Sequence, residues 1–479
     1  MLFPQRPRSS GTAMRYYLMR SALTAFTLLA AICGSPNALF AQSSQWILRT
    51  QNGPSPRRYH AMAYDAARDR TVLFGGFNGH ANGETWEWDG QVWALRDSGG
   101  TNSPPPRWGH ALVYDTFRKE TVLFGGYRPG DTNDTWTWNG QSWTQRDPGG
   151  LGGSRPSARR IHAMDFDSSR GVAVLFGGQS DQGGFLDDTW EWNGSAWVAR
   201  ATFGPLARAA HAQAFDSLRG VSVLFGGYDV TPNAETWEWN GLEWTLRTVD
   251  FPQARGAHAM SFDTFRGVTV MYGGETYEWN GLTWGQVAGI GPPARSSGAM
   301  AFDIGRGVAV YFGGGEGEST FFGDTWELCG CSVSLSPKFQ FGCPGSSFEI
   351  IASVLGKGPF GYQWRRSGFP IDASSNPTAT TNTLVVESSL PRDGGEYDCI
   401  VTRSCGAFTS ASVSVVVLPD LNGDGIINTA DLALLLARFG QVAPHGSPTA
   451  IADLNGDGTV NSVDLSLLLL RFGQSCTDN

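Results

Sequence analysis

Residues 159–200, RRIHAMDFDSSRGVAVLFGGQSDQGGFLDDTWEWNGSAWVAR, contain one full copy of a unit that recurs six times between Arg58 and Trp326. With local variation, each copy reads Arg-x-x-His-Ala-Met-x-Phe-Asp, Val-Leu-Phe-Gly-Gly, Asp-Thr-Trp-Glu-Trp-Asn-Gly and x-x-Trp-x-x-Arg. The four pieces are short and rich in β-branched and aromatic residues, so each predicts a β-strand. The Asn-Gly and Asp-Gly pairs predict tight hairpin turns. Each unit is therefore expected to be a four-stranded antiparallel sheet.

The two ends of this predicted sheet differ in how much the copies vary. The turn after the first strand (FDSSRGV, FDSLRGV, FDTFRGV) and the Asn-Gly turn are nearly constant. The links after the second and fourth strands vary in length and sequence, which is typical of a face that recognises a ligand. The candidate ligand-binding residues on this variable face are His80, Tyr127, Arg128, Asp131, Asp181, Phe185, Tyr228, Asp229, Glu316, Glu318, Phe321 and Phe322.

Units of about fifty residues with a Gly-Gly after the second strand and a Trp in the fourth resemble kelch repeats. The resemblance covers residues 45 to about 328 and implies a six-bladed β-propeller, here placed at residues 42–330. Strand counting gives six first, second and third strands, but only five fourth strands that follow a third. The segment QWILRT, residues 45–50, matches the missing fourth strand. We therefore expect it to close the last blade and to remove an open sheet edge.

The length, the net charge and the N-terminal segment limit the classes of protein to which the chain can belong. A chain of 479 residues is too long for one ordinary core, so several domains are expected. Two arginines, an apolar run from residue 22 to 33 and a final Ala41 predict a secretory signal peptide over residues 1–41, which makes the protein secreted or cell-surface bound. Its removal takes away four arginines and no acid, and moves the formal net charge from −9 to −13. An acidic chain without a basic stripe excludes a nucleic-acid partner, and no mature segment is long enough for a transmembrane helix.

Residues 331–418 alternate polar and apolar side chains between turn signals, which predicts a small β-sandwich. Cys343, Trp364, Tyr397 and Cys399 resemble the immunoglobulin pattern. That resemblance implies a disulfide between Cys343 and Cys399, a Trp packed on it, and a corner hydrogen bond from the Tyr. The six cysteines of an exported mature chain favour disulfides. Cys405 is left to pair with Cys329 or Cys331, and Cys476 is left unassigned.

Two nearly identical segments, DLNGDGIINTAD from Asp420 and DLNGDGTVNSVD from Asp453, carry the sharpest chemical motif. Oxygen-bearing side chains stand at positions 1, 3, 5, 9 and 12, position 6 is Gly, and position 7 offers a backbone carbonyl. This is the arrangement of an EF-hand calcium loop, except that Asp replaces the usual Glu at position 12. The predicted ligands are Asp420, Asn422, Asp424, Ile426, Asn428, Asp431, Asp453, Asn455, Asp457, Thr459, Asn461 and Asp464.

Each loop is followed by an apolar helix that ends in Arg-Phe-Gly, and residues 420–473 resemble a type I dockerin. Within residues 419–479, the resemblance implies a small helical domain with two structural Ca²⁺ ions and a cohesin-like partner or surface scaffold. The Asp at position 12 agrees with that family. Partner docking is expected to involve Thr429, Ala430, Arg438, Ser462, Val463 and Arg471.

The repeated histidines, acids and tryptophans occupy fixed repeat positions, so we interpret them as structural, and no catalytic residue is nominated. Residues 42–328 contain no Cys, which excludes the Tyr–Cys cofactor of galactose-oxidase-like propellers. The favoured function is a secreted binding or scaffold protein whose propeller recognises a glycan or a protein. The alternatives are a carbohydrate-active enzyme of an extracellular polysaccharide-degrading complex and a purely structural surface protein.

Overall fold

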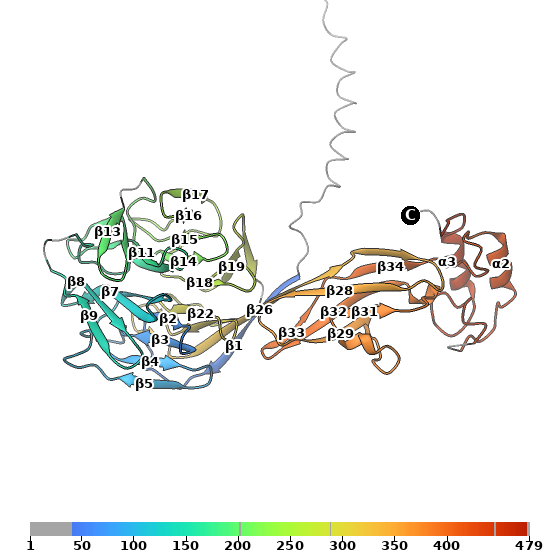
Figure 1. Ribbon diagram of the computed structural model, residues 1–479, viewed down its shortest axis with the longest axis horizontal. Coiled ribbons are helices and arrows are strands. Elements are labelled where there is room, and N and C mark those ends of the chain that lie inside the picture. The colour runs from blue at the N-terminus through green and yellow to red at the C-terminus, as the bar shows by residue number, and fades with distance from the viewer. Residues whose placement is uncertain are drawn as a thin grey trace, which may run out of the picture. The chain divides into compact units, whose positions relative to one another are not determined.

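The computed structural model describes residues 41–476, except 151, 153, 201–202, 288 and 445–446 (Figure 1). The predicted signal peptide lies outside the described residues apart from Ala41, where strand β1 begins. The described chain is mainly β, with helices α2 and α3 confined to its C-terminal part. No helix in the described residues has the length and hydropathy needed to cross a membrane.

Five consecutive units each form a four-stranded antiparallel sheet with strands in chain order. Sheet 1 has β2 (Ala61–Asp65), β3 (Arg70–Phe74), β4 (Thr85–Trp88) and β5 (Trp93–Asp97), and sheet 2 has β6 (Ala111–Asp115), β7 (Glu120–Arg128), β8 (Gly130–Trp138) and β9 (Trp143–Asp147). Sheet 3 has β10 (Ala163–Asp167), β11 (Val172–Gln179), β12 (Phe185–Trp192) and β13 (Trp197–Arg200). Sheet 4 has β14 (Ala212–Asp216), β15 (Val221–Phe225), β16 (Thr236–Trp239) and β17 (Trp244–Thr248), and sheet 5 has β18 (Ala259–Asp263), β19 (Val268–Tyr272), β20 (Thr276–Trp279) and β21 (Trp284–Val287).

Sheet 6 takes its fourth strand from the beginning of the described chain. It contains β22 (Ala299–Asp303), β23 (Val308–Phe312), β26 (Thr325–Ser336) and β1 (Ala41–Thr50), and a small hairpin of β24 (Gly315–Glu316) and β25 (Thr320–Phe321) precedes β26. Strand β1 runs antiparallel to β26, with Trp46 opposite Leu328 and Leu48 opposite Trp326. Residues 45–50 therefore occupy the place that the fourth strand holds in the other five sheets.

The six sheets follow one another in a closed cycle, because the first strand of each contacts the first strands of its two neighbours and β22 contacts β2. A ring of six backbone hydrogen bonds accompanies this cycle. One residue per sheet donates its N–H to the carbonyl of the preceding sheet's equivalent residue, over 2.6–2.9 Å. All six have a positive φ, between 47° and 67°, and they are Tyr59, Gly109, Ile161, Ala210, Ala257 and Ser297.

Neighbouring sheets are also joined by repeated side-chain contacts. The fourth-strand Trp of each sheet donates its indole N–H to the Thr that precedes the first aromatic residue of the repeat's Thr-Trp motif on the third strand of the preceding sheet, as Trp143 does to Thr85 over 2.8 Å. Within each repeat, the acid before that Thr pairs with the Arg of the same repeat's Arg-x-x-His segment, as Asp134 does with Arg107. The repeated Trp, Arg and acidic residues thus stabilise the scaffold, as their fixed positions indicate.

Strand β26 continues without a break from sheet 6 into a two-sheet sandwich, so the predicted boundary at residues 330/331 falls inside a strand. On one side, β26 pairs with β28 (Phe348–Leu355), which pairs with β31 (Thr383–Val386). The other sheet has β27 (Phe339–Gly342), β34 (Val413–Val417), β32 (Gly395–Arg403), β29 (Gly361–Arg366), β30 (Phe369–Pro370) and β33 (Gly406–Thr409). Two 3₁₀ turns, η1 (Pro377–Thr380) and η2 (Pro391–Asp393), complete it.

The disulfide predicted between Cys343 and Cys399 is wrong. Cys343 pairs with Cys476, and Cys329 pairs with Cys405, while Cys331 and Cys399 are free and buried. The reason is that Cys343 follows β27, whereas the core position on β28 is filled by the apolar Ile350, fully buried in one cluster with Trp364 and Cys399. The predicted corner hydrogen bond is confirmed: the Tyr397 hydroxyl donates to the carbonyl of Asp393 over 2.5 Å.

The C-terminal part consists of two loops, each followed by a helix: α2 (Thr429–Leu436) and α3 (Ser462–Leu470). Leu435 and Leu468, one from each helix, are fully buried in a shared core with Ile427 and Val460. The last described segment lies along the first loop, where the Cys476 N–H donates to the carbonyl of Gly425 over 2.8 Å. The disulfide from Cys476 to Cys343 therefore ties this loop to the sandwich.

Candidate functional site

Three carboxylates converge in the first C-terminal loop. One oxygen each from Asp420, Asp424 and Asp431 lies within 4.8 Å of the other two. Asp420 and Asp431 are buried, and no described Arg, Lys or His forms an ion pair with any of the three. Like charges held this close favour a bound cation, and carboxylate oxygens are the ligands that Ca²⁺ prefers. The residues therefore fit a calcium ion.

Backbone hydrogen bonds hold the first loop in this shape. The two Asp420 oxygens accept from the N–H groups of Gly423 and Gly425, over 2.8 and 2.9 Å. Gly425 has φ +88°, the left-handed conformation that the sharp turn at position 6 requires. Asp431 accepts from the Asn428 N–H, while the Asn428 side chain caps α2. Positions 9 and 12 thus start the helix and supply two of the predicted ligands.

The remaining predicted ligands of the first loop gather around Asp424. The amide groups of Asn422 and Asn428 donate to its Oδ2, over 2.7 and 3.2 Å, and Asn428 also donates to the Ile426 carbonyl. These contacts gather the side chains of positions 3, 5 and 9 and the carbonyl of position 7 within one loop. The pKa of Asp424 is lowered, first by the hydrogen bond from Asn422.

The second loop repeats the same contacts. Asp453 accepts from Gly458 over 2.9 Å, and Asp464 accepts from Asn461 over 2.8 Å in a second capping box. Hydrogen bonds from Asn455, and then from Thr459, lower the pKa of Asp457 to about 2, so this carboxylate is charged at neutral pH. The two loops therefore share one local structure, as their sequences predict.

The residues expected to dock a partner lie at the surface of the two helices. Thr429 and Ala430, like Ser462 and Val463, are exposed in the first turns of α2 and α3. Arg438 is half-buried and donates to the Leu434 carbonyl. Large apolar side chains are also exposed along the two helices and just after them, namely Leu436, Phe439, Leu469, Leu470 and Phe472. Such exposed apolar side chains are typical of a binding surface.

Comparison with known proteins identifies one module. Residues 418–471 match the family described as the dockerin type I domain. Such a domain binds calcium and supports a calcium-dependent tether into a cohesin-bearing complex. No curated protein matches the chain.

Three solved structures resemble the chain at low identity. "Structure of YjhT" covers 60% of this chain and 97% of its own, with 13% identity and a TM-score of 0.44. "Tandem Ig repeats of Dlar" covers 41% and 87%, with 12% identity and a TM-score of 0.18. The N-terminal Ig1-2 module of the Drosophila receptor protein tyrosine phosphatase DLAR covers 51% and 89%, again with 12% identity and a TM-score of 0.18.

The twelve candidate residues of the variable face separate into two groups and one further residue. Tyr127, Asp131, Phe185, Tyr228 and Phe321 belong to contacts between side chains near the ring of six hydrogen bonds. Six others are exposed loop residues: His80, Arg128, Asp181, Asp229, Glu316 and Glu318. The last, Phe322, lies beneath the Arg295 guanidinium at 3.7 Å from its ring centre, which is a scaffold contact.

The sequence analysis missed the neighbours that complete the first group. Tyr59, Trp108 and Arg160 fill the two unspecified positions of Arg-x-x-His, directly before the first strands. Their residue types differ from copy to copy inside an otherwise constant stretch. That variation was the available signal, since scaffold positions in the same stretch are nearly invariant.

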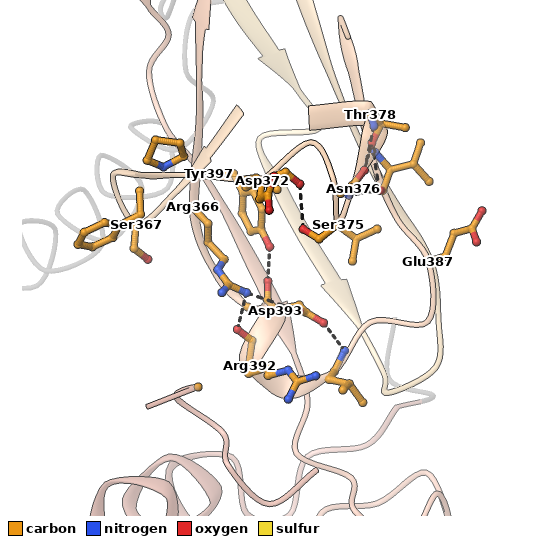
Figure 2. Close-up of a pocket in the computed structure, with 18 of the residues that line it drawn as sticks. Arg366, Ser367, Asp372, Ser375, Asn376, Thr378, Glu387, Arg392, Asp393 and Tyr397 are labelled. Atoms are coloured by element: carbon orange, nitrogen blue, oxygen red, sulfur yellow. Dashed lines mark hydrogen bonds and ion pairs between the residues drawn. The ribbon is translucent and has the colours of Figure 1, made fainter. Parts of the chain in front are cut away.

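A cavity of about 1040 Å³ lies against the sandwich and is also lined by Asn455 and Gly456 (Figure 2). Several of its polar groups are engaged in hydrogen bonds to the protein itself. Arg366 donates to the carbonyl of Arg392, Tyr397 donates to Asp393, and Asp393 accepts from the Leu390 N–H. These bonds stabilise the η2 turn, so we interpret the cavity as structural.

The repeated histidines form no metal or catalytic cluster in the described residues. Each of the five is buried with its ring edge-on to a second-strand Phe of the preceding sheet, as His110 is to Phe74 at 5.3 Å. Burial lowers the pKa of His60, His110, His211 and His258 to about 3. These imidazoles are therefore neutral packing groups.

Proposed function

We propose that the chain is an extracellular binding protein in which a six-bladed kelch-like propeller, residues 42–330, is tethered by its dockerin domain to a cohesin-bearing scaffold. The proposed calcium-dependent tether is supported chiefly by one observation. The carboxylates of Asp420, Asp424 and Asp431 converge in a loop whose sequence pattern is that of a calcium loop. Two structural Ca²⁺ ions, one in each loop, would order helices α2 and α3 and present their exposed residues.

The propeller interpretation is supported by the closed cycle of six sheets and by the hydrogen-bond ring between them. In such a fold, the links after the second and fourth strands lie at one face, and here these links carry the sequence variation. We propose that this face recognises the ligand. The acids repeated in the scaffold are paired with arginines, so they are not free for catalysis.

The tether is tested by a pull-down of the mature chain, residues 42–479, with immobilised cohesin modules in Ca²⁺ and in EDTA. Capture in Ca²⁺ that is lost in EDTA, and lost in an Asp431→Ala, Asp464→Ala double variant, is expected. Equal capture in both buffers would reject the calcium-dependent tether. Recognition by the propeller is tested separately, on a glycan array whose spots are also checked for cleavage products, since cleavage would favour the enzyme alternative.

A further inference from the structure

The ring of six backbone hydrogen bonds is flanked by unequal side chains. Sheets 1 to 3 place large residues at and before the ring positions, except for Gly109 in sheet 2, whereas sheets 4 to 6 place only small ones there. The large residues are Arg58, Tyr59, Trp108, Arg160 and Ile161, and the small ones are Ala209, Ala210, Gly256, Ala257, Ser296 and Ser297. The side chains beside the ring of hydrogen bonds therefore do not follow the repeat symmetry of the scaffold. Such a departure favours a role in ligand binding over a role in packing.

The large side chains form an aromatic cluster. The Trp108 indole lies between Tyr59 and Tyr127, with ring centres 5.3 and 5.0 Å apart and tilts of 39° and 43°. The Arg160 guanidinium lies 5.2 Å from the Tyr127 ring centre. All four side chains are half-buried, so each keeps part of its surface exposed to solvent.

Polar groups border the rings. Arg160 pairs with Asp131 over 2.8 Å and donates to Gln179 over 3.2 Å. The Asp131 side chain is 0% exposed, and its second oxygen has no partner among the described residues. Burial raises the pKa of Asp131, and Arg160 opposes that effect. A buried carboxylate oxygen without a donor is costly and indicates a position where a ligand or water hydroxyl donates.

Tyr228 reaches this cluster from sheet 4. Its ring lies against Gly256, where an added Cβ would stand 2.9 Å from the ring, so the neighbouring sheet leaves room for it. Burial, and then the neighbouring Tyr59, raises the pKa of Tyr228, while Arg160 lowers it. Tyr228 is therefore neutral, and its backbone pairs with that of Ala209, directly before the ring residue Ala210. It offers one more hydroxyl beside the aromatic rings.

We propose that this cluster binds a neutral pyranose unit of a glycan, an inference that rests on the propeller's proposed recognition role. The C–H face of a sugar ring packs on the exposed parts of Tyr59 and Trp108, and its hydroxyls bond to the Arg160–Asp131 pair and Tyr228. Binding sites commonly combine apolar rings with a few placed polar groups in this way.

The local charges favour a neutral sugar over an anionic one. Arg160 is already neutralised by Asp131, and the raised pKa of Asp131 also reflects the nearby Asp181. Arg58 donates to the carbonyl of Gly317, which stands between Glu316 and Glu318. An anionic glycan would therefore meet carboxylates next to each arginine and would be repelled.

The test measures binding of neutral cello- and xylo-oligosaccharides, and of an anionic oligogalacturonate, to the calcium-loaded mature chain by titration calorimetry. Trp108→Ala is expected to weaken neutral binding by about tenfold or more, because the platform is lost. Tyr228→Phe, which keeps the ring, is expected to weaken it by about threefold to tenfold through loss of one hydroxyl. The matched control is Phe117→Ala, which removes an aromatic ring that is 63% exposed in the turn between β6 and β7. It is expected to bind as the parent does.

The outcomes separate this inference from the proposed function. Neutral binding that is unchanged in both Trp108→Ala and Tyr228→Phe would reject this site while leaving glycan recognition in place. Binding of the anionic probe alone would reject the ligand class. Binding of no saccharide, with capture only of a protein ligand, would reject the inference and leave the calcium tether to its own pull-down. Circular dichroism melts of each variant exclude misfolding as the cause.

Discussion

The indole N–H of Trp46 donates to the Thr276 hydroxyl over 2.8 Å. The other five fourth-strand tryptophans make the same bond to the preceding sheet, over 2.8–3.0 Å: Trp93, Trp143, Trp197, Trp244 and Trp284. Trp46 therefore performs in sheet 6 the role that an internal residue performs in every other sheet, although more than two hundred residues separate it from Thr276.

Replacing Trp46 should weaken the closure of sheet 6. We expect Trp46→Ala to lower the free energy of unfolding by about 2–4 kcal/mol, because it removes a half-buried indole and its hydrogen bond. Urea denaturation followed by tryptophan fluorescence measures the change. Leu48→Ala, on the same strand but 43% exposed, is the control and should cost less than about 1 kcal/mol. Equal losses in the two variants would contradict a specific role for Trp46.

Removal of calcium should unfold the C-terminal domain alone. The carboxylates of Asp420, Asp424 and Asp431 repel one another without a cation, and an ion that binds only the folded state stabilises it by mass action. In calorimetry, EDTA should therefore lower or abolish the transition of residues 420–473 and leave the transition of the six repeat sheets in place. Added Mg²⁺ is the control and should restore less than Ca²⁺ does. An unchanged C-terminal transition would show that the loops fold without metal.

Asp165 should make stability depend on pH. This buried carboxyl on β10 accepts a hydrogen bond from Ser222 over 2.9 Å, and burial raises its pKa to about 7. The unfolded chain ionises Asp165 near pH 4 while the folded chain keeps it protonated, so stability should fall as pH rises from about 4 to about 7. The expected contribution of this group is about 2–4 kcal/mol.

The Asp165→Asn variant isolates this effect. As pH rises from about 4 to 7 and above, the unfolding free energy of Asp165→Asn should increase relative to that of the parent. The unfolding free energy of Asp250→Asn, at an exposed position, should show the same pH dependence as that of the parent. Urea titrations at pH 4.5, 6 and 7.5 measure the difference. A parent-to-variant difference that is the same at all three values would contradict the raised pKa.

The disulfides should be found by peptide mapping under non-reducing conditions. The expected linked peptides join Cys343 to Cys476 and Cys329 to Cys405, and Cys331 and Cys399 should be alkylated only after unfolding, because both are buried. Cys343→Ala should destabilise the C-terminal domain by about 2–4 kcal/mol, with Cys331→Ala as the control. A linked peptide that contains Cys343 and Cys399 would overturn this pairing.

The features that the sequence predicts well are those set by local patterns. The strands of each repeat, the Asn-Gly turns, the corner bond of Tyr397 and the loops at Asp420 and Asp453 all depend on residues close in sequence. The partner of Cys343 does not, because it depends on how the distant segment that carries Cys476 returns to the sandwich. The spacing of the cysteines along the sequence does not determine the route of the chain between them.

The aromatic cluster proposed to bind a glycan and the buried acid Asp165 could not be predicted from the sequence, for a related reason. Tyr59, Trp108 and Asp165 fill unspecified positions of the repeat, where one copy differs from the next. Each is unremarkable in its own repeat. The cycle of sheets brings Tyr59 and Trp108, which come from two different sheets, into contact.

The pairing of β1 with β26 also sets the order of folding. The strand that completes sheet 6 is the first of the described strands to be synthesised, and its partner follows only after sheets 1 to 5. Those five sheets pair strands that are adjacent in the chain, so each forms early from local contacts, whereas closure joins distant segments and comes late. A nascent chain that stops before Thr325 would carry two unpaired edges, and chaperone protection is needed most in that interval.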